Sequence, residues 1–235
     1  GSFSATGLPP GLSINSATGT ITGDTSVTGS QNFTVTATGT TAGGGTVTVS
    51  KVYTVEISDP SSFPFRMDLT IASSKVNSTL TDFPLLVSLS TSITGFSYNA
   101  LLDPDSDGIR TGGDLRFYAS NGKELAYEIA DWNTSGTSNI WVKVPAISSS
   151  ANTVITAVWG KTETETTPDY ATEDPVWSNG YEGAWHLGEI NSGTTNDSSP
   201  NSIHLTANGG PSLSTGQIGK GFTLDGSDDD LEAAG

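Results

Sequence analysis

The sequence contains no cysteine and little positive charge. Without cysteine the chain has no disulfide bond, no thiolate nucleophile and no thiolate metal site. The two histidines, His186 and His204, are too few for a histidine-rich zinc site. Nine Lys and Arg residues stand against 25 Asp and Glu residues, a net charge of −16. This charge repels phosphate backbones, so we expect no nucleic-acid partner.

Long hydrophobic runs are also missing. No run reaches the roughly 18 apolar residues of a transmembrane helix, so the sequence predicts no membrane insertion. The first residues show no basic region followed by an apolar stretch, so we expect no signal peptide in this chain. The G-x-S-x-G, P-loop and dinucleotide-binding motifs are absent as well. We therefore predict that the chain is not an enzyme.

Serine and threonine are abundant, with 66 of 235 positions, whereas only 14 % of the residues are charged. Such a composition occurs in disordered chains as well as in β-rich proteins. The five Trp, six Tyr and eight Phe residues lie mostly in segments with strand-like alternation, and disordered segments lack such aromatic content. The composition together with this pattern favours an ordered β protein.

Apolar and threonine side chains alternate with a period of two. Phe33, Val35 and Ala37 share one face of an extended segment, and threonines occupy the other face. Lys51 interrupts the apolar face of the next such segment, so we expect a bulge or an exposed sheet edge there. The pattern predicts an all-β fold of tandem β-sandwich modules. Further strands are expected at 67–72, 84–90, 114–119, 124–130, 139–144 and 153–159.

Residues 1–59 carry the motifs GLPPGLS at 7–13 and TGTITG at 18–23. These motifs resemble a bacterial family of immunoglobulin-like (Ig-like) modules, which implies a spacer in a long surface protein. A complete Ig-like sandwich needs about 100 residues and seven strands. We therefore expect 1–59 to be a partial Ig-like β-sandwich.

Residues 60–176 resemble the bacterial family called domain of unknown function 2341, through five short motifs in order. The resemblance implies a β-sandwich module of multidomain secreted or surface-bound bacterial proteins, with no established chemistry. The motifs are FRMDLTI at 65–71, DFPLLV at 82–87, DLRF at 114–117, YEI at 127–129 and WVKVP at 141–145.

Residues 177–235 carry GAWHL at 183–187, the run Asp-Ser-Ser-Pro-Asn at 197–201 and GKGFTLDGSDD at 219–229. These motifs resemble the start of a laminin-G/concanavalin-A-like module. The resemblance implies the N-terminal part of a jelly roll, a fold that often binds carbohydrate. Because an incomplete sandwich leaves strand edges unpaired, we expect a neighbouring chain or a further segment to complete the end modules.

An acidic stretch matches the spacing of a calcium-binding loop. Acidic side chains occupy positions 1, 3, 5 and 12, glycine is at position 6, and position 7 offers a backbone carbonyl. Aspartate replaces the usual glutamate at position 12. A solvated acidic loop is the alternative, in which the last aspartate only begins the next strand. The candidate calcium ligands are Asp103, Asp105, Asp107, Ile109 and Asp114.

A second acidic stretch at 225–232 is either a solvated turn or a further calcium site. Among the aromatic residues, Trp132 lies between Asp131 and Asn133 in a turn-like context, which suggests an exposed platform for a sugar ring. Trp141 lies on the strand face opposite three apolar residues, where it either stacks on a sugar or forms a second core layer. We take these four residues as candidate ligand-binding residues, with core packing as the alternative for both tryptophans.

These patterns together predict a secreted or cell-surface bacterial protein of adhesion or scaffolding type, with possible binding of a glycan or another surface ligand. Calcium is the only cofactor that we expect. Two alternatives remain open at this stage. The chain is either an accessory glycan-binding segment of a polysaccharide-degrading enzyme, or a subunit of an extracellular polymer completed by strand exchange.

Overall fold

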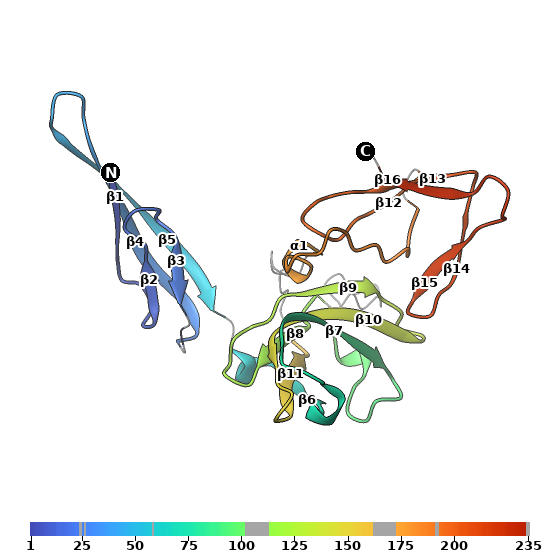
Figure 1. Ribbon diagram of the computed structural model, residues 1–235. Helices are drawn as coiled ribbons and strands as arrows, with labels where there is room; N and C mark the ends of the chain where they lie inside the picture. Colours follow the sequence, from blue (N-terminus) through green and yellow to red (C-terminus); the bar gives the residue numbers. More distant parts are fainter. Residues whose placement is uncertain are drawn as a thin grey trace. The chain divides into compact units, whose positions relative to one another are not determined.

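The computed structural model describes residues 1–23, 25, 27–57, 59–101, 113–161, 173–190 and 193–233. The chain forms two compact units, Gly1–Ser62 and Phe63–Gly235, which we call the N-terminal and C-terminal units (Figure 1). All paired strands in both units are antiparallel. The predicted all-β fold is confirmed.

The N-terminal unit contains one three-stranded sheet and one small hairpin. The sheet has the order β1-β4-β5, and β2 pairs with β3. The bounds are β1 (Ser2–Thr6), β2 (Leu12–Ile14), β3 (Ile21–Gly23), β4 (Gly29–Thr40) and β5 (Thr46–Ile57).

One face of the β1-β4-β5 sheet is apolar but poorly covered. The side chain of Phe33 stacks on Tyr53, with ring centroids 5.8 Å apart. Val47 and Val49 of β5 are 53 % and 66 % exposed, and Pro9 is the one buried residue among those described in this unit. The β4–β5 ladder passes Lys51 without a shift, so the predicted interruption is an exposed sheet edge and not a bulge.

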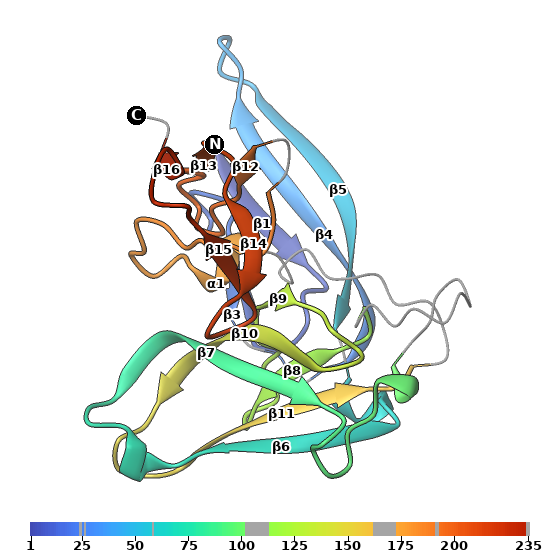
Figure 2. The ribbon, with the colours of Figure 1, turned by 90° about the vertical axis from the view of Figure 1, so that its right-hand side faces the viewer.

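The C-terminal unit is built on a β-sandwich of two three-stranded sheets. The sheet orders are β7-β10-β9 and β6-β11-β8, and Figure 2 shows them as two layers. The bounds are β6 (Phe65–Ile71), β7 (Leu80–Ser90), β8 (Arg116–Ala119), β9 (Tyr127–Asp131), β10 (Thr137–Ile147) and β11 (Thr153–Trp159). Each of the six strands overlaps a segment for which the sequence predicted extended structure.

The hydrophobic core lies between these two sheets. Alternate residues of β10, namely Ile140, Val142 and Val144, are at most 2 % exposed and pack against Phe117 of β8 and Ile155 of β11. A β-strand directs alternate side chains to opposite faces. Asn139, Trp141 and Lys143 therefore occupy the outer face of β10, which supports the predicted division of this strand into a core face and a second face.

The remainder of the C-terminal unit, residues 173–233, has little regular structure, and we call it the C-terminal segment. It contains a sheet of order β12-β13-β16 and the hairpin β14–β15. The bounds are α1 (Glu173–Val176), β12 (Thr194–Thr195), β13 (Leu205–Asn208), β14 (Ser212–Thr215), β15 (Lys220–Thr223) and β16 (Asp230–Ala233). Short 3-10 helices span η1 (Pro60–Ser62), η2 (Ser73–Lys75) and η3 (Tyr98–Ala100). Across the described ranges, no helix has the length and apolar character that a membrane span requires.

Asp82 distorts β7 at the DFPLLV motif. Its φ is +46°, and the β7–β10 ladder has no pair at this position, where the residue opposite is Pro145, which has no N–H to donate. Aspartate and asparagine tolerate this left-handed conformation better than other side chains except glycine. The aspartate of the motif therefore has a backbone role at this position.

We predict that Asp82→Gly changes the free energy of unfolding by less than about 1 kcal/mol. Asp82→Val should destabilise the protein by about 1–2 kcal/mol, because a branched side chain is strained in the left-handed region. Chemical denaturation measures both values, with Thr81→Val as a control at a neighbouring exposed position. Equal stability of the glycine and valine variants would contradict this account.

Candidate functional site

The outer face of β9 and β10 carries the polar and aromatic residues of the candidate site. In the ladder, Glu128 of β9 pairs with Trp141 of β10, and Asp131 pairs with Asn139. The WVKVP and YEI motifs therefore lie side by side on adjacent strands. Asn139 pairs on its other side with Ser88 of β7, whose hydroxyl donates to Asn139 Oδ1 at 2.9 Å.

A β-bulge decides which residues of β9 face outward. Ile129 pairs with Ile140, but the next pair is Asp131 with Asn139, so Ala130 is an extra residue on β9. Regular alternation would place Ala130 opposite Asn139 and direct Asp131 to the core. A bulge reverses the facing of every residue after it. It therefore directs Asp131 outward and Trp132 inward.

The structure consequently places Trp132 differently from the exposed platform that the sequence suggested. Its ring packs against the sandwich core and makes an edge contact with Tyr98, with centroids 5.4 Å apart. Its neighbour Asn133 is exposed, and the Asn133 backbone N–H donates to Ser138 Oγ at 2.8 Å. The candidate sugar platform at Trp132 is corrected to a core residue, because the bulge exchanges its face with that of Asp131.

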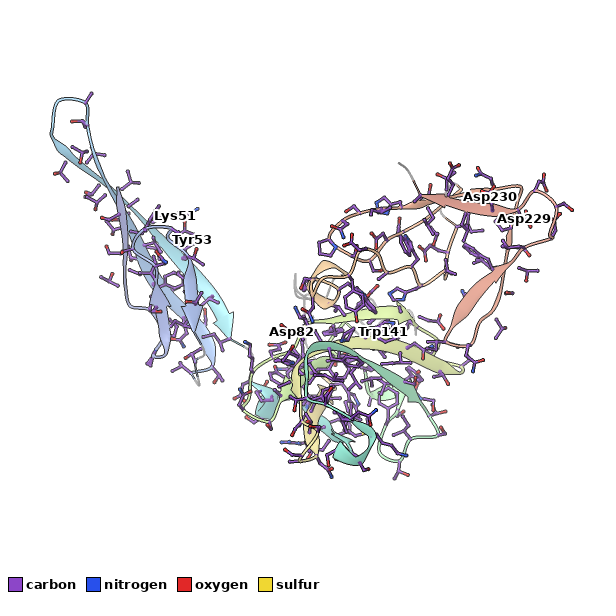
Figure 3. All side chains as sticks on the ribbon, viewed as in Figure 1. Lys51, Tyr53, Asp82, Trp141, Asp229 and Asp230 are labelled. Atoms are coloured by element: carbon purple, nitrogen blue, oxygen red, sulfur yellow. The ribbon has the colours of Figure 1, made fainter. Side chains whose placement is uncertain are left out.

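Trp141 occupies the outer face (Figure 3), where the rings of Trp177 and His186 lie against it. Its ring contacts Trp177 at 5.2 Å in an edge arrangement and stacks with His186 at 6.1 Å. The indole Nε1 is buried and has no hydrogen-bond acceptor among the described residues. Trp141 thus belongs to a second layer of packing, and part of its ring also lines a cavity.

Glu128 binds the C-terminal segment to the sandwich through three of its residues. This buried carboxylate accepts hydrogen bonds from Trp177 Nε1 at 2.5 Å and from Ser198 Oγ at 2.8 Å. His186 Nε2 lies 2.9 Å from Glu128 Oε1, at ion-pair distance, although the ring N–H does not point along a hydrogen-bond direction. A buried carboxylate is tolerated only when donors compensate its lost hydration. Without the C-terminal segment, Glu128 would lose these partners.

Asp197 organises the same segment internally. Its two oxygens accept from the backbone N–H groups of Ala184, Ser199 and Ile203 and from Ser199 Oγ, at 2.7–2.9 Å. Burial by itself would raise the pKa of Asp197, but these hydrogen bonds outweigh burial and hold the pKa below its usual value. The motif at 197–201 is therefore a structural turn closed by its own aspartate.

A cavity of about 250 Å³ lies between the outer sheet face and the C-terminal segment. Asp131, Asn139 and Trp141 line it from the sheet. The lining residues from the C-terminal segment include Trp185, His186, Glu189 and Lys220. A second cavity of about 500 Å³ adjoins it, and Asp131, Asn139, Ile218 and Gly219 line both cavities. We call the two cavities together the groove.

Two polar groups at the shared wall of the groove are not engaged within the described part of the chain. The Asp131 carboxylate makes no hydrogen bond there, and Asn139 uses only its Oδ1, which leaves its Nδ2 amide without a partner. Asn139 is 6 % exposed. Gly219 lies close to both groups. A Cβ atom at this position would be 3.5–3.6 Å from the Asp131 side chain and 3.6 Å from Asn139 Nδ2, which is ordinary van der Waals contact. The groove thus has a carboxylate acceptor beside an amide donor.

Leu187, next to the groove, has a backbone conformation in the left-handed region. Its φ is +55°, which is uncommon for a large apolar residue and costs about 1–3 kcal/mol. The left-handed residue turns the chain between His186 and Gly188, both of which line the first cavity. This strained turn places the imidazole ring of His186 and the backbone of Gly188 at the groove.

The predicted calcium ligands Asp103, Asp105, Asp107 and Ile109 lie outside the described residues. Asp114 is described and fully buried, and its Oδ2 accepts from the backbone N–H groups of Gly160 and Lys161 at 2.6 and 2.9 Å. This contact supports the structural role that the sequence left open for Asp114. Calcium binding at this loop stays a prediction.

The other charged residue of the DLRF motif is also structural. Arg116 is 2 % exposed and donates to the carbonyl oxygens of Gly113 and Leu115 at 2.7 and 2.8 Å. Tyr127 OH donates to the same Leu115 oxygen at 2.7 Å, and burial raises the pKa of Tyr127 to about 12. The buried tyrosine therefore stays protonated. Arg116 and Tyr127 together bind the backbone carbonyl groups that directly precede β8.

The second acidic stretch brings Asp225, Asp228 and Asp229 together, with carboxylate oxygens within 4.8 Å of one another. Asp229 Oδ2 accepts the Asp225 backbone N–H at 2.8 Å, and Asp225 Oδ1 accepts the Ser227 backbone N–H at 2.8 Å. Figure 3 labels Asp229 and Asp230 near β16. These bonds are those of a turn, so the solvated turn and the further calcium site both stay open.

Comparison with known families gives two matches. Residues 2–58 match the family model described as Putative Ig domain, and residues 111–173 match Domain of unknown function (DUF2341). The chain is an Ig-like plus DUF2341 multidomain protein. The searches of curated proteins and of solved structures gave no match.

The DUF2341 match begins at residue 111, so the FRMDLTI and DFPLLV motifs lie before it. The Ig-like domain indicates a module of surface or adhesion type. The resemblance of 177–235 to a laminin-G/concanavalin-A-like module stays a prediction.

Sequence reasoning identified three of the groove residues: Asp131, Asn133 and Trp141. It missed Asn139, although the alternation that places Trp141 on the outer face also places Asn139 there. Trp185 and His186 stood in a motif noted only for its family resemblance. Nothing in the local pattern shows that this segment folds back onto β9 and β10, so tertiary contacts alone reveal their role.

We predict that the docking of residues 183–203 weakens in acid through Asp197. Its lowered pKa in the folded state contributes stability that is present above its unfolded pKa of about 4 and is lost as the pH falls through the folded pKa. Hydrogen exchange of this segment between pH 6 and pH 3 should show falling protection. Asp197→Asn should reduce its local stability by about 1.5–3 kcal/mol at neutral pH and remove this acid dependence.

Glu182→Gln is the matched control, because Glu182 is exposed and this variant removes the same charge. It should leave both the neutral-pH protection and the acid dependence unchanged. Equal acid dependence in the wild type and in Asp197→Asn would show that another group is responsible.

Proposed function

We propose that this chain is a non-catalytic, carbohydrate-binding segment of a secreted or cell-surface bacterial protein of adhesion or scaffolding type. The observation that carries the carbohydrate proposal is the groove, where Asp131 and Asn139 offer an acceptor and a donor beside indole rings. Small-molecule sites combine apolar and aromatic walls with a few convergent polar groups. Sugars match this combination, because their rings present apolar C–H faces and their hydroxyls donate and accept.

The Ig-like domain supports the setting of the proposal, since it indicates a surface or adhesion-type module. Residues 1–59 would then be a spacer and the C-terminal unit the binding part. An accessory role beside a polysaccharide-degrading enzyme would use the same groove. The exposed edge strand β5, with Val47 and Val49, supports the remaining alternative, completion of the end module by a neighbouring chain.

The test of carbohydrate binding is a glycan array followed by calorimetric titration of the sugars that bind. Asp131→Ala should weaken binding about 10- to 100-fold, because hydrogen bonds to a charged group contribute about 1.5–3 kcal/mol. The fold should tolerate this variant, since the Asp131 side chain makes no hydrogen bond within the described residues. Trp141→Phe should also weaken binding, through the loss of ring area in the first cavity.

Thr134→Ala is the control for both variants, because Thr134 is exposed and lies three residues beyond Asp131 without lining the groove. It should bind as the wild type does. The proposal fails if the array shows no bound glycan, or if Asp131→Ala binds with unchanged affinity.

We also propose that calcium stabilises the C-terminal unit through the loop that contains Asp103, Asp105, Asp107 and Ile109. The support is the spacing of these residues, which suits the six to eight oxygen ligands of calcium. At a calcium concentration about 100 times the Kd, the Tm should rise by about 5–10 °C and return on chelation. Calorimetry measures this change.

The double variant Asp103→Ala, Asp105→Ala should remove the calcium-dependent rise in Tm, because alanine offers no side-chain oxygen at these two ligand positions. Glu182→Gln, which removes a charge at an exposed position outside both acidic stretches, serves as the comparison and should keep the calcium-dependent rise. A Tm that is unaffected by millimolar calcium would rule the site out.

A further inference from the structure

The groove consists of two cavities that meet at one wall. The β14–β15 turn lies next to β10 in both Figure 1 and Figure 2, and its Ile218 and Gly219 line both cavities together with Asp131 and Asn139. Sites for drug-sized molecules measure about 300–1,000 Å³. The first cavity, at about 250 Å³, is below this range, whereas the second is about 500 Å³. A molecule that fills the site therefore extends across the shared wall.

The shared wall has the chemistry to hold adjacent hydroxyl groups. The Asp131 carboxylate only accepts hydrogen bonds, and the Asn139 Nδ2 amide only donates them. Asn139 is held in place by the bond from Ser88 to its Oδ1, so its free amide is presented in a defined direction. Neighbouring hydroxyls of a sugar ring can donate to one group and accept from the other.

The two cavities differ in their walls. The first has the indole rings of Trp141 and Trp185, which suit the apolar face of a sugar ring. The second has neutral hydrogen-bonding side chains, among them Asn133, Thr137 and Gln217. An extended molecule would therefore place one ring against the indoles and continue along amide and hydroxyl groups.

The charges of the groove are unfavourable for an anion. Asp131 and Glu189 line the first cavity, with Lys220 as its one cationic lining residue. In the second cavity Asp131 is the charged lining residue. Like charges brought together at an interface cost several kcal/mol. The net charge of −16 adds repulsion at longer range.

We infer that the groove binds a non-anionic oligosaccharide of at least two sugar units, which lies across the wall formed by Asp131, Asn139 and Gly219. This inference rests on the proposed function and specifies its ligand class by length and by charge. The first unit packs against Trp141 and Trp185. The next unit reaches Asn133 and Gln217 in the second cavity.

The length is tested by titrating the wild-type chain with gluco-, galacto- and manno-oligosaccharides of one, two and four units. The tetrasaccharide of the series that binds should bind at least about tenfold more tightly than its monosaccharide. Asn133→Ala and Gln217→Ala should each weaken tetrasaccharide binding about two- to tenfold and leave monosaccharide binding unchanged. Both residues are exposed, and the bond that Asn133→Ala removes, from the Ser135 backbone N–H to Asn133 Oδ1 at 3.1 Å, lies in an exposed turn, so these variants should fold. Thr134→Ala again serves as the control.

The charge is tested with oligo-uronates of the same linkage and length. The oligo-uronates should bind the wild type at least about tenfold more weakly than the uncharged series, because Asp131 and Glu189 repel them. Asp131→Asn should weaken binding of the uncharged series. It should also narrow the difference in affinity between the uncharged series and the uronates, because it removes one repelling carboxylate.

Each outcome decides between the two proposals. Equal affinity of the monosaccharide and tetrasaccharide would overturn the extended mode, and tighter binding of the uronates than of the uncharged series would overturn the non-anionic class. In both cases carbohydrate binding itself would stand. If no sugar of any series binds, the proposed function fails and this inference fails with it.

Discussion

The burial of Glu128 on the outer face of the sandwich is the constraint on which the groove depends. A carboxylate on an exposed sheet face needs no partner, but a covered one must receive donors. Trp177 and Ser198 donate to it and His186 lies at ion-pair distance, and all three come from the segment that follows the sandwich. Because the same segment carries Trp185 and Glu189, satisfying Glu128 also assembles one wall of the groove.

Asp197 stabilises the segment itself, as Glu128 stabilises its attachment to the sheet. A segment with so few buried apolar residues cannot be held by a hydrophobic core alone. Its buried residues are largely polar, and Asp197 satisfies three backbone N–H groups and one hydroxyl within it. The segment therefore keeps its shape through directional hydrogen bonds and is attached to the sheet through a second buried carboxylate. A site built in this way places Trp185 and His186 more accurately than a loose loop would.

The β9 bulge connects the fold to the chemistry of the site. One extra residue, Ala130, exchanges the faces of Asp131 and Trp132. The tryptophan gains core contacts with Tyr98, and the aspartate reaches the groove beside Asn139. Bulges are common next to functional sites because they redirect a side chain without disturbing the rest of the sheet. Here the redirected residue is a carboxylate on which the proposed binding depends.

The alternation of apolar residues with threonine and other polar residues determined the all-β class and the approximate positions of the six sandwich strands, because side-chain direction follows a period of two in any strand. It also assigned Ile140, Val142 and Val144 to the core and Trp141 to the opposite face. Only the tertiary structure decided the facing of Asp131 and Trp132, since a bulge depends on the register with β10 and leaves no mark in local alternation. Only the tertiary structure brought Trp185 and Gly219 to the sheet, because contacts between residues about 45–90 positions apart depend on how the segment folds back.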